Sequence, residues 1–259
     1  MHNKIIDFHT HPIFKPEQNI LMYKDSYDFT IENFKENLLK SGISKFCGSV
    51  INPNKDSSVL EKVLDNNACA YKLCEIYEGD YIPGIHIHPD YIEESFNQID
   101  EASSREVRLI GELVPYLDGW DYSHKGIHPI LDYAEKKGMI VSVHSTDSDA
   151  LDSWLEEHPN LIIVGAHPGD WSFFFKQLER LKKYDNYMLD ISATGITRFG
   201  MLKKLVDEIG SERILFGSDY PSCDPNVFIS GVLQNPLISD SDKENILFKN
   251  AQRLLNIKI

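Results

Sequence analysis

Eight short apolar runs recur along this chain, separated by longer amphipathic segments, and this alternation limits the folds that the sequence can adopt. The runs cover residues 4–8, 44–51, 81–87, 107–114, 139–143, 161–166, 187–191 and 213–216. Apolar runs of this length are typical of buried strands, and helical segments between them favour parallel pairing. The sequence therefore predicts an α/β fold, the (β/α)8 TIM barrel, whose functional residues come from the carboxyl ends of the strands.

The segments between the runs have the periodicity of helices. Helices are expected at residues 31–40, 57–75, 91–103, 127–137, 149–157, 171–183 and 200–209. Gly42, Gly138 and Gly210 follow three of these segments, where a left-handed cap residue is expected. The tail, residues 239–255, predicts one or two closing helices.

The pattern contains no internal repeat and no Gly/Ser linker. Residues 1–259 are therefore expected to form one domain, a length that is ordinary for an α/β barrel. The connection at residues 12–30 is longer than a typical loop after a strand. It is expected either to cover the barrel mouth or to pack on its rim.

Histidines and an aspartate close several of the predicted strands. His9 and His11 stand two residues apart, so on a strand both side chains lie on one face and reach the same metal ion. His144, His167 and Asp219 close three later runs. Because the strand ends meet at one end of a barrel, these five donors predict a metal site. The alternative is a set of structural histidines and a helix-capping aspartate.

These residues resemble the amidohydrolase superfamily, in particular its amidohydrolase-related branch. The resemblance is carried by HTH at 9–11, VSVH at 141–144, VGAHPG at 164–169, LFGSDYP at 215–221 and ENILFKNAQRLL at 244–255. It spans nearly the whole chain and implies a metal-dependent barrel enzyme, usually hydrolytic and sometimes decarboxylating. It also implies roles for the donors: His9, His11 and His144 as metal ligands, His167 as a second-metal ligand or catalytic residue, and Asp219 as a ligand that shuttles protons.

Glu112 ends the fourth run, where two-metal members of the superfamily carry a bridging carboxylated lysine or a glutamate. A glutamate there can span two ions roughly 3.5–4 Å apart. The alternative is a carboxylate that only orients a ligand histidine. We expect the bridge, and with it two divalent ions; the alternative role of Glu112 would leave one ion. Zinc is the expected metal, with manganese as the alternative.

The expected chemistry follows from the donor set. A bound zinc ion lowers the pKa of its water toward about 7, which supplies a nucleophile at neutral pH. Asp219 would accept the proton of this water and pass it to the leaving group. His167, where it is not a ligand, would polarise the substrate carbonyl or stabilise the developing oxyanion.

Three further residues are candidates for substrate contact. His86 and His88 form a second pair with the same spacing, at the end of the third run, and hydrogen bonds to neighbours are the alternative for both. Arg198 follows the seventh run and would hold an anionic substrate group, with a surface salt bridge as the alternative. Cys223, four residues after Asp219, is expected to take no part in the chemistry.

The sequence supports three functions. The first is a hydrolase that cleaves an amide, lactone or ester of a small molecule, which the complete donor set and Glu112 favour. The second is a non-oxidative decarboxylase of an unsaturated or aromatic acid with one metal, in which Arg198 would hold the carboxylate. The third is a non-catalytic metal-binding barrel.

Charge and composition exclude other partners. The net charge is −14, with 40 acidic and 26 basic residues, which repels phosphate backbones and anionic membranes. No run approaches the roughly 20 apolar residues that cross a bilayer, and no apolar leader precedes the first strand. Four scattered cysteines are consistent with a reducing compartment. We therefore expect a cytoplasmic protein with a small-molecule substrate, as a monomer or a homo-oligomer.

Overall fold

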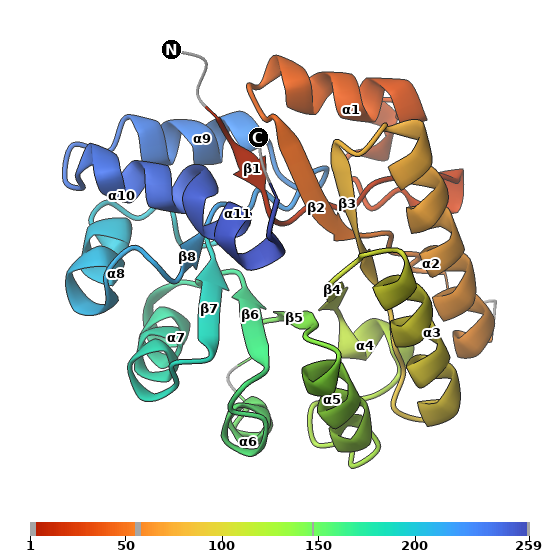
Figure 1. The fold of residues 1–259 in the computed structure, drawn as a ribbon. Coiled ribbons are helices and arrows are strands. Elements are labelled where there is room, and N and C mark those ends of the chain that lie inside the picture. Colours follow the sequence, from red (N-terminus) through yellow and green to blue (C-terminus); the bar gives the residue numbers. More distant parts are fainter. Residues whose placement is uncertain (1–3, 55–57, 147, 258–259) are drawn as a thin grey trace.

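The structure, a computed structural model, describes residues 4–54, 58–146 and 148–257. Eight parallel strands pair in chain order, and helices surround them (Figure 1). The strands are β1 (Ile6–Asp7), β2 (Lys45–Ser49), β3 (Tyr81–Ile85), β4 (Leu109–Leu113), β5 (Ile140–His144), β6 (Ile162–Ala166), β7 (Tyr187–Asp190) and β8 (Ile214–Leu215). Each strand falls on one of the predicted runs, and the predicted (β/α)8 barrel is confirmed.

Backbone hydrogen bonds beyond the two shortest strands bring the ends of the sheet together. Phe8 N donates to Phe216 O at 2.8 Å, and Asp219 N donates to His9 O at the same distance. The segment after β1 is therefore bound to the segment after β8. This closure places His9 and Asp219 side by side, although 210 positions separate them in the chain.

The helices follow the expected order. They are α1 (Ile31–Lys40), α2 (Val59–Ile76), α3 (Ile92–Ser104), α4 (Pro115–Asp118), α5 (Ile127–Lys136), α6 (Ala150–Glu157), α7 (Trp171–Lys183), α8 (Met201–Ile209), α9 (Pro225–Leu233), α10 (Asp240–Glu244) and α11 (Asn250–Leu255). Short 3-10 turns, η1 (Pro16–Gln18) and η2 (Lys24–Ser26), lie in the long connection after β1, and a π-helical segment, η3 (Asn245–Lys249), joins α10 to α11.

The predicted helices are confirmed, with small shifts at their ends. Helix α2 begins at Val59 because the Ser58 side chain accepts a hydrogen bond from Glu61 N at 3.3 Å, and the expected start at residue 57 lies outside the described residues.

Helices α4 and α9 were not expected. Both begin with a proline, Pro115 and Pro225, in segments for which no helix was predicted.

The expected helix caps are present. The φ angles are +89° at Gly42, +64° at Gly138 and +74° at Gly210, which is the left-handed region where glycine is favoured. At the start of α10, Ser239 and Asp242 form a capping box: each side chain accepts a hydrogen bond from the backbone N–H of the other, at 3.2 and 3.1 Å.

Neighbouring residues of each strand alternate between two apolar clusters, as the period of a strand requires. One cluster fills the inside of the barrel: Ile6, Phe8, Cys47, Leu109, Ile140, Val164, Met188, Leu215, Ala251 and Leu255. The larger cluster packs the outer faces of the strands against the helices. Ala251 and Leu255 belong to α11, so this helix completes the inner cluster and leaves the other end of the barrel for the polar residues described below.

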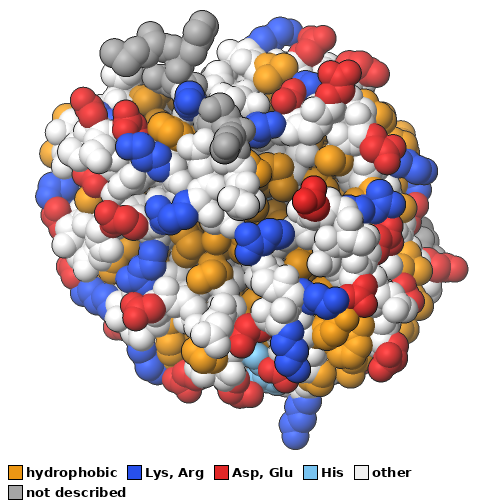
Figure 2. Space-filling model, viewed as in Figure 1, with side chains coloured by type: hydrophobic (Ala, Val, Ile, Leu, Met, Phe, Trp, Pro, Cys, Tyr) orange, Lys and Arg blue, Asp and Glu red, His pale blue; other side chains and the backbone are white. Residues whose placement is uncertain are grey.

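Charged side chains of both signs lie on the face of the molecule that Figure 2 shows. On the face in Figure 2, Lys and Arg side chains are interspersed with Asp and Glu and form no continuous basic patch. None of the helices in the described ranges has the length and apolar character that a bilayer crossing requires.

Candidate metal centre

The side chains expected to bind metal gather at the carboxyl end of the strands. His9 and His11 follow β1, Glu112 lies in β4, His144 ends β5, and His167 and Asp219 follow β6 and β8. The structure brings all six together, in overlapping groups whose ligand atoms lie within 4.8 Å of one another. Their spacing meets the geometric requirement for a metal site.

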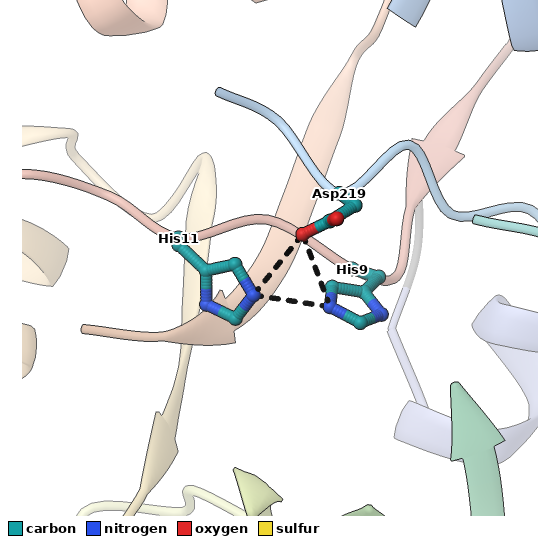
Figure 3. Close-up of side chains that lie close together, drawn as sticks. All are labelled: His9, His11 and Asp219. Atoms are coloured by element: carbon teal, nitrogen blue, oxygen red, sulfur yellow. Dashed lines mark hydrogen bonds and ion pairs between the residues drawn. The ribbon is translucent and has the colours of Figure 1, made fainter. Parts of the chain in front are cut away.

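His9, His11 and Asp219 form the first group (Figure 3). The two Nε2 atoms are 3.1 Å apart, and Asp219 Oδ1 lies 3.7 Å from His9 Nε2 and 3.4 Å from His11 Nε2. Both imidazoles are almost completely buried, whereas Asp219 is 14 % exposed. Asp219 is thus the member of this group that faces the open end of the barrel.

The Nδ1 atom of each of these two imidazoles faces a hydrogen-bond acceptor. His11 Nδ1 lies 3.0 Å from the Ser49 carbonyl oxygen, and His9 Nδ1 lies 2.9 Å from Asp190 Oδ2. These partners favour a proton on each Nδ1, which leaves the lone pairs of both Nε2 atoms directed at the centre of the group. When both rings are neutral, these lone pairs and the carboxylate converge on one point, so the donor set fits a divalent ion.

Glu112 connects this group to a second one. Its Oε2 is 3.4 Å from the Nε2 atoms of both His9 and His11. Its Oε1 is 3.1 Å from His144 Nδ1 and 3.5 Å from His167 Nε2. Each oxygen of one buried carboxylate therefore faces a different pair of imidazoles, which is the orientation that a bridging ligand requires.

The electrostatics of the site favour positive charge. Burial alone would lower the pKa of His9, but the Asp190 and Glu112 carboxylates raise it well above its usual range. Burial likewise opposes charge on His11, yet hydrogen bonds to Asp219 and Glu112 raise its pKa to about 9. Burial would raise the pKa of Glu112, but the charge of His9 and the surrounding histidines hold it well below its usual value. The Glu112 carboxylate thus keeps its charge, which protons on the two imidazoles balance in the metal-free protein and a divalent ion would balance in their place.

His167 differs from His9 and His11 in its charge and in the partner of its Nδ1 atom. Burial lowers its pKa more than the Glu112 carboxylate raises it, so the ring is neutral. Its Nδ1 lies 2.9 Å from Ser192 Oγ, which leaves Nε2 facing Glu112. The φ angles of His167 and Asp219 are +66° and +63°, in a region that costs non-glycine residues about 1–3 kcal/mol. Such strain at both residues is typical of functional positions.

Three polar residues of the site were not expected. Asp190 ends β7 and is completely buried beside His9. Ser192 donates a hydrogen bond to Asp190 and contacts both His9 and His167. Asp7 accepts hydrogen bonds from Ser218, and its burial raises its pKa to about 7. The sequence did indicate that two of them have partners. Asp7 and Asp190 each interrupt an apolar run, and a buried carboxylate without a partner would be costly there.

His86 and His88 are buried behind the site and contact backbone carbonyls. His86 Nε2 lies 2.8 Å from Val50 O, and His88 Nε2 lies 3.1 Å from Asp118 O. Burial lowers the pKa of His86. These contacts match the alternative given above, hydrogen bonding to neighbours, and the role of the pair in substrate contact stays a prediction.

Arg198 and Cys223 lie at the edges of the site. The Arg198 side chain is 71 % exposed, and its Nε lies 2.9 Å from Asp170 Oδ1, the surface salt bridge given as the alternative. Burial, with a smaller effect of Asp219, raises the pKa of Cys223 to about 11, so its thiol stays protonated at neutral pH. Substrate binding by Arg198 also stays a prediction.

A cavity of about 490 Å³ opens above the metal-ligand candidates. His11, Glu112, His144, His167 and Asp219 form its floor, and its walls are Ile20, Met22, Ile51, Pro53, Val114, Tyr116, Leu117, Ser145, Phe173, Ala193, Thr194 and Ser222. Ile20 and Met22 belong to the long connection at 12–30, so part of that connection lies at the barrel mouth. His86, His88 and Arg198 are not among the lining residues in the described part of the chain.

Comparison with known proteins gives one family. The family model described as Amidohydrolase matches residues 6–257. No curated protein matches the chain in sequence.

Solved structures share the fold at low sequence identity. A structural genomics target described as amidohydrolase II has a TM-score of 0.74 and 15% identity, with 98% of this chain and 100% of that chain covered. A Staphylococcus aureus protein assigned to the amidohydrolases has a TM-score of 0.72 and 16% identity over 98% and 100%. A dihydroxybenzoic acid decarboxylase from Polaromonas sp. JS666, with bound manganese and 2-nitroresorcinol, has a TM-score of 0.70 and 14% identity over 98% and 97%.

Proposed function

Because the chain belongs to the amidohydrolase family, we propose that it is a metal-dependent hydrolase that cleaves an amide, lactone or ester of a small molecule. The observation that carries this proposal is the orientation of Glu112. Its two oxygens face two pairs of imidazoles, so one carboxylate can join two ions. A bridged pair of ions favours attack of water on a carbonyl.

We assign the ligands of the two ions from these contacts. His9, His11 and Asp219 would hold the first ion, and His144 and His167 the second, with Glu112 between them. Zinc suits imidazole and carboxylate ligands, and manganese is the alternative because neighbours were crystallised with it. When bound, the ions would lower the pKa of a coordinated water and polarise the carbonyl of the substrate.

The chain supplies the proton transfers. Asp219 is the more exposed of the two carboxylates that line the cavity, and its Oδ1 lies near both Nε2 atoms of the first group. It would accept the proton of the attacking water and deliver it to the leaving group. Asp190 and Ser49 do not reach the substrate. They hold the rings of His9 and His11 in the orientation that ligation needs.

The cavity favours an uncharged substrate. Its walls are mainly aliphatic and aromatic, with hydroxyl groups at Ser145, Thr194 and Ser222. Among its described lining residues there is no lysine and no arginine to hold a carboxylate. This composition suits an amide, lactone or ester better than a carboxylic acid.

A decarboxylase is the second candidate, and the structural neighbours favour it. Several are described as decarboxylases of dihydroxybenzoate or 5-carboxyvanillate, at 13 to 14% identity. In that case one ion would suffice, and Glu112 would only orient histidines.

The cytoplasmic location and any homo-oligomer also stay predictions.

The choice between these functions is tested by the products. We expect that a panel of lactones, amides, esters and aromatic acids, assayed in ¹⁸O-labelled water, yields an acid that carries solvent oxygen and no carbon dioxide. Carbon dioxide formed in step with substrate loss, without label in the product, would replace the hydrolase by the decarboxylase. Protein treated with chelator is the control for background hydrolysis.

Gly217 allows a test of how His9 is positioned. A Cβ at this position would lie 2.8 Å from His9 Cβ and 3.0 Å from Asp190 Oδ1. Gly217→Ala is therefore expected to disturb the contact between His9 and Asp190 and to weaken metal affinity by about 10- to 100-fold. Competition with a chromogenic chelator measures this.

The matched control is Gly231→Ala in α9, where the nearest atom to a new Cβ is Ile196 Cδ1 at 3.4 Å. This variant should keep the metal affinity of the parent protein. Equal affinities in all three proteins would show that the contact of His9 with Asp190 does not matter for ligation.

A further inference from the structure

A second cluster of metal-binding residue types lies outside the barrel, between α5 and α6. His128 is near the start of α5, Glu157 is the last residue of α6, and His158 follows it. The three ligand atoms lie within 4.8 Å of one another. In Figure 2, histidine surface is exposed in the part of this face where α5 and α6 lie in Figure 1. None of these residues belongs to the centre at the barrel mouth.

The distances suit a zinc site. His128 Nδ1 is 3.1 Å from His158 Nε2 and 3.2 Å from Glu157 Oε2. Ligands about 2.0–2.1 Å from a tetrahedral zinc ion lie roughly 3.3 Å from each other. Two of the three distances therefore match those around a tetrahedral zinc ion, and the third, between His158 and Glu157, lies within 4.8 Å. Two imidazoles and one carboxylate leave a fourth position for water.

His158 is buried against α5. Its side chain is 3 % exposed, and its Nδ1 lies 3.2 Å from Asp132 Oδ1, one turn along α5 from His128. This is an ion-pair contact without hydrogen-bond geometry, and among the described residues His158 Nδ1 has no hydrogen-bond partner. The backbone is also held, because Asn186 Nδ2 donates to His158 O at 3.0 Å.

The charge state of His158 agrees with this arrangement. Burial lowers its pKa more than the nearby Asp132 raises it, so the ring is neutral and Nε2 can act as a ligand. The facing groups are His128 on α5, Glu157 on α6 and Asp132 on α5. The carboxylates of Glu157 and Asp132 beside the two imidazoles give this pocket negative charge, which attracts a divalent cation.

We propose that His128, Glu157 and His158 form a second zinc site, separate from the barrel centre, which joins α5 to α6. An ion here cross-links two helices that are neighbours on the outside of the barrel. It binds the folded chain and therefore stabilises it, by an amount that grows with the logarithm of the free zinc concentration. Without zinc, the 3.1 Å contact is a hydrogen bond from one imidazole to the other.

The test counts ions in variants that share an intact barrel centre. Holoenzyme and variants are equilibrated with the same free zinc concentration, and zinc per chain is measured by elemental analysis. We expect His128→Ala to hold one ion fewer than the parent protein. Excess zinc should raise the thermal midpoint of the parent protein more than that of His128→Ala, in which only the barrel centre contributes to the shift.

His124→Ala is the matched control, because His124 is a nearby histidine of similar exposure that pairs with Asp90 instead. It should keep the parent count and the thermal shift. If His128→Ala fails to fold, Glu157→Gln replaces it. Glu157 is 58 % exposed, so this change leaves the packing intact and should weaken zinc binding at this site about 10-fold. Equal ion counts and equal thermal shifts in the parent protein and these variants would overturn the second site. That result would leave the barrel centre unaffected.

Discussion

Replacing Asp219 by asparagine is expected to lower kcat by about 10²- to 10⁴-fold. An amide cannot accept the proton of the attacking water, and it is also a poorer metal ligand. Asp219 and Glu112 both line the cavity, but Asp219 is 14 % exposed against 4 % for Glu112, whose carboxylate contacts four imidazoles. Steady-state kinetics at saturating metal separate the loss of the proton acceptor from the loss of a ligand.

Cys223→Ser provides the control for Asp219→Asn, because Cys223 lies in the same loop and Asp219 influences its pKa. We expect this variant to keep kcat within a few-fold of the parent value. Full kcat in Asp219→Asn, with the metal content unchanged, would exclude Asp219 as the proton acceptor.

Removal of divalent ions is expected to abolish turnover, and zinc or manganese is expected to restore it. The fold should survive, because the inner apolar cluster lies below the site and none of its members is a metal-ligand candidate. Circular dichroism of the metal-free protein checks this, and activity is followed as metal is returned. Full turnover in rigorously metal-free protein would contradict the account.

The barrel was predictable because strand and helix periodicities differ and each recurs along the chain. The residues at which the strands begin and end were harder to predict. β1 and β8 contain two residues each, since Phe8 and Asp219 make backbone bonds across the closure instead of continuing a regular strand pair. Helices α4 and α9, of four and nine residues, were missed. Each begins with a proline, Pro115 or Pro225, and Asp224 caps α9, but these end signals are weaker than a recurring apolar period.

The candidate ligands were predictable for a simple geometric reason. Residues at the carboxyl ends of barrel strands all lie at the same end of the barrel, whatever conformation the loops adopt. Contacts made by loops do not follow this rule. His86 and His88 satisfy it, yet their rings meet Val50 O and Asp118 O, and the positions of those carbonyls depend on tertiary structure. Arg198 pairs with Asp170 from another loop for the same reason.

The central claim is that Glu112 joins two ions, and the number of zinc equivalents that restores activity tests it most directly. Metal-free protein is titrated with zinc in the His128→Ala background, so that the outer site contributes no ion. The account predicts an activity endpoint at two equivalents per chain, with two ions by elemental analysis, and a fall toward one ion in Glu112→Gln. An endpoint at one equivalent, with the single ion retained in Glu112→Gln, would contradict the bridge.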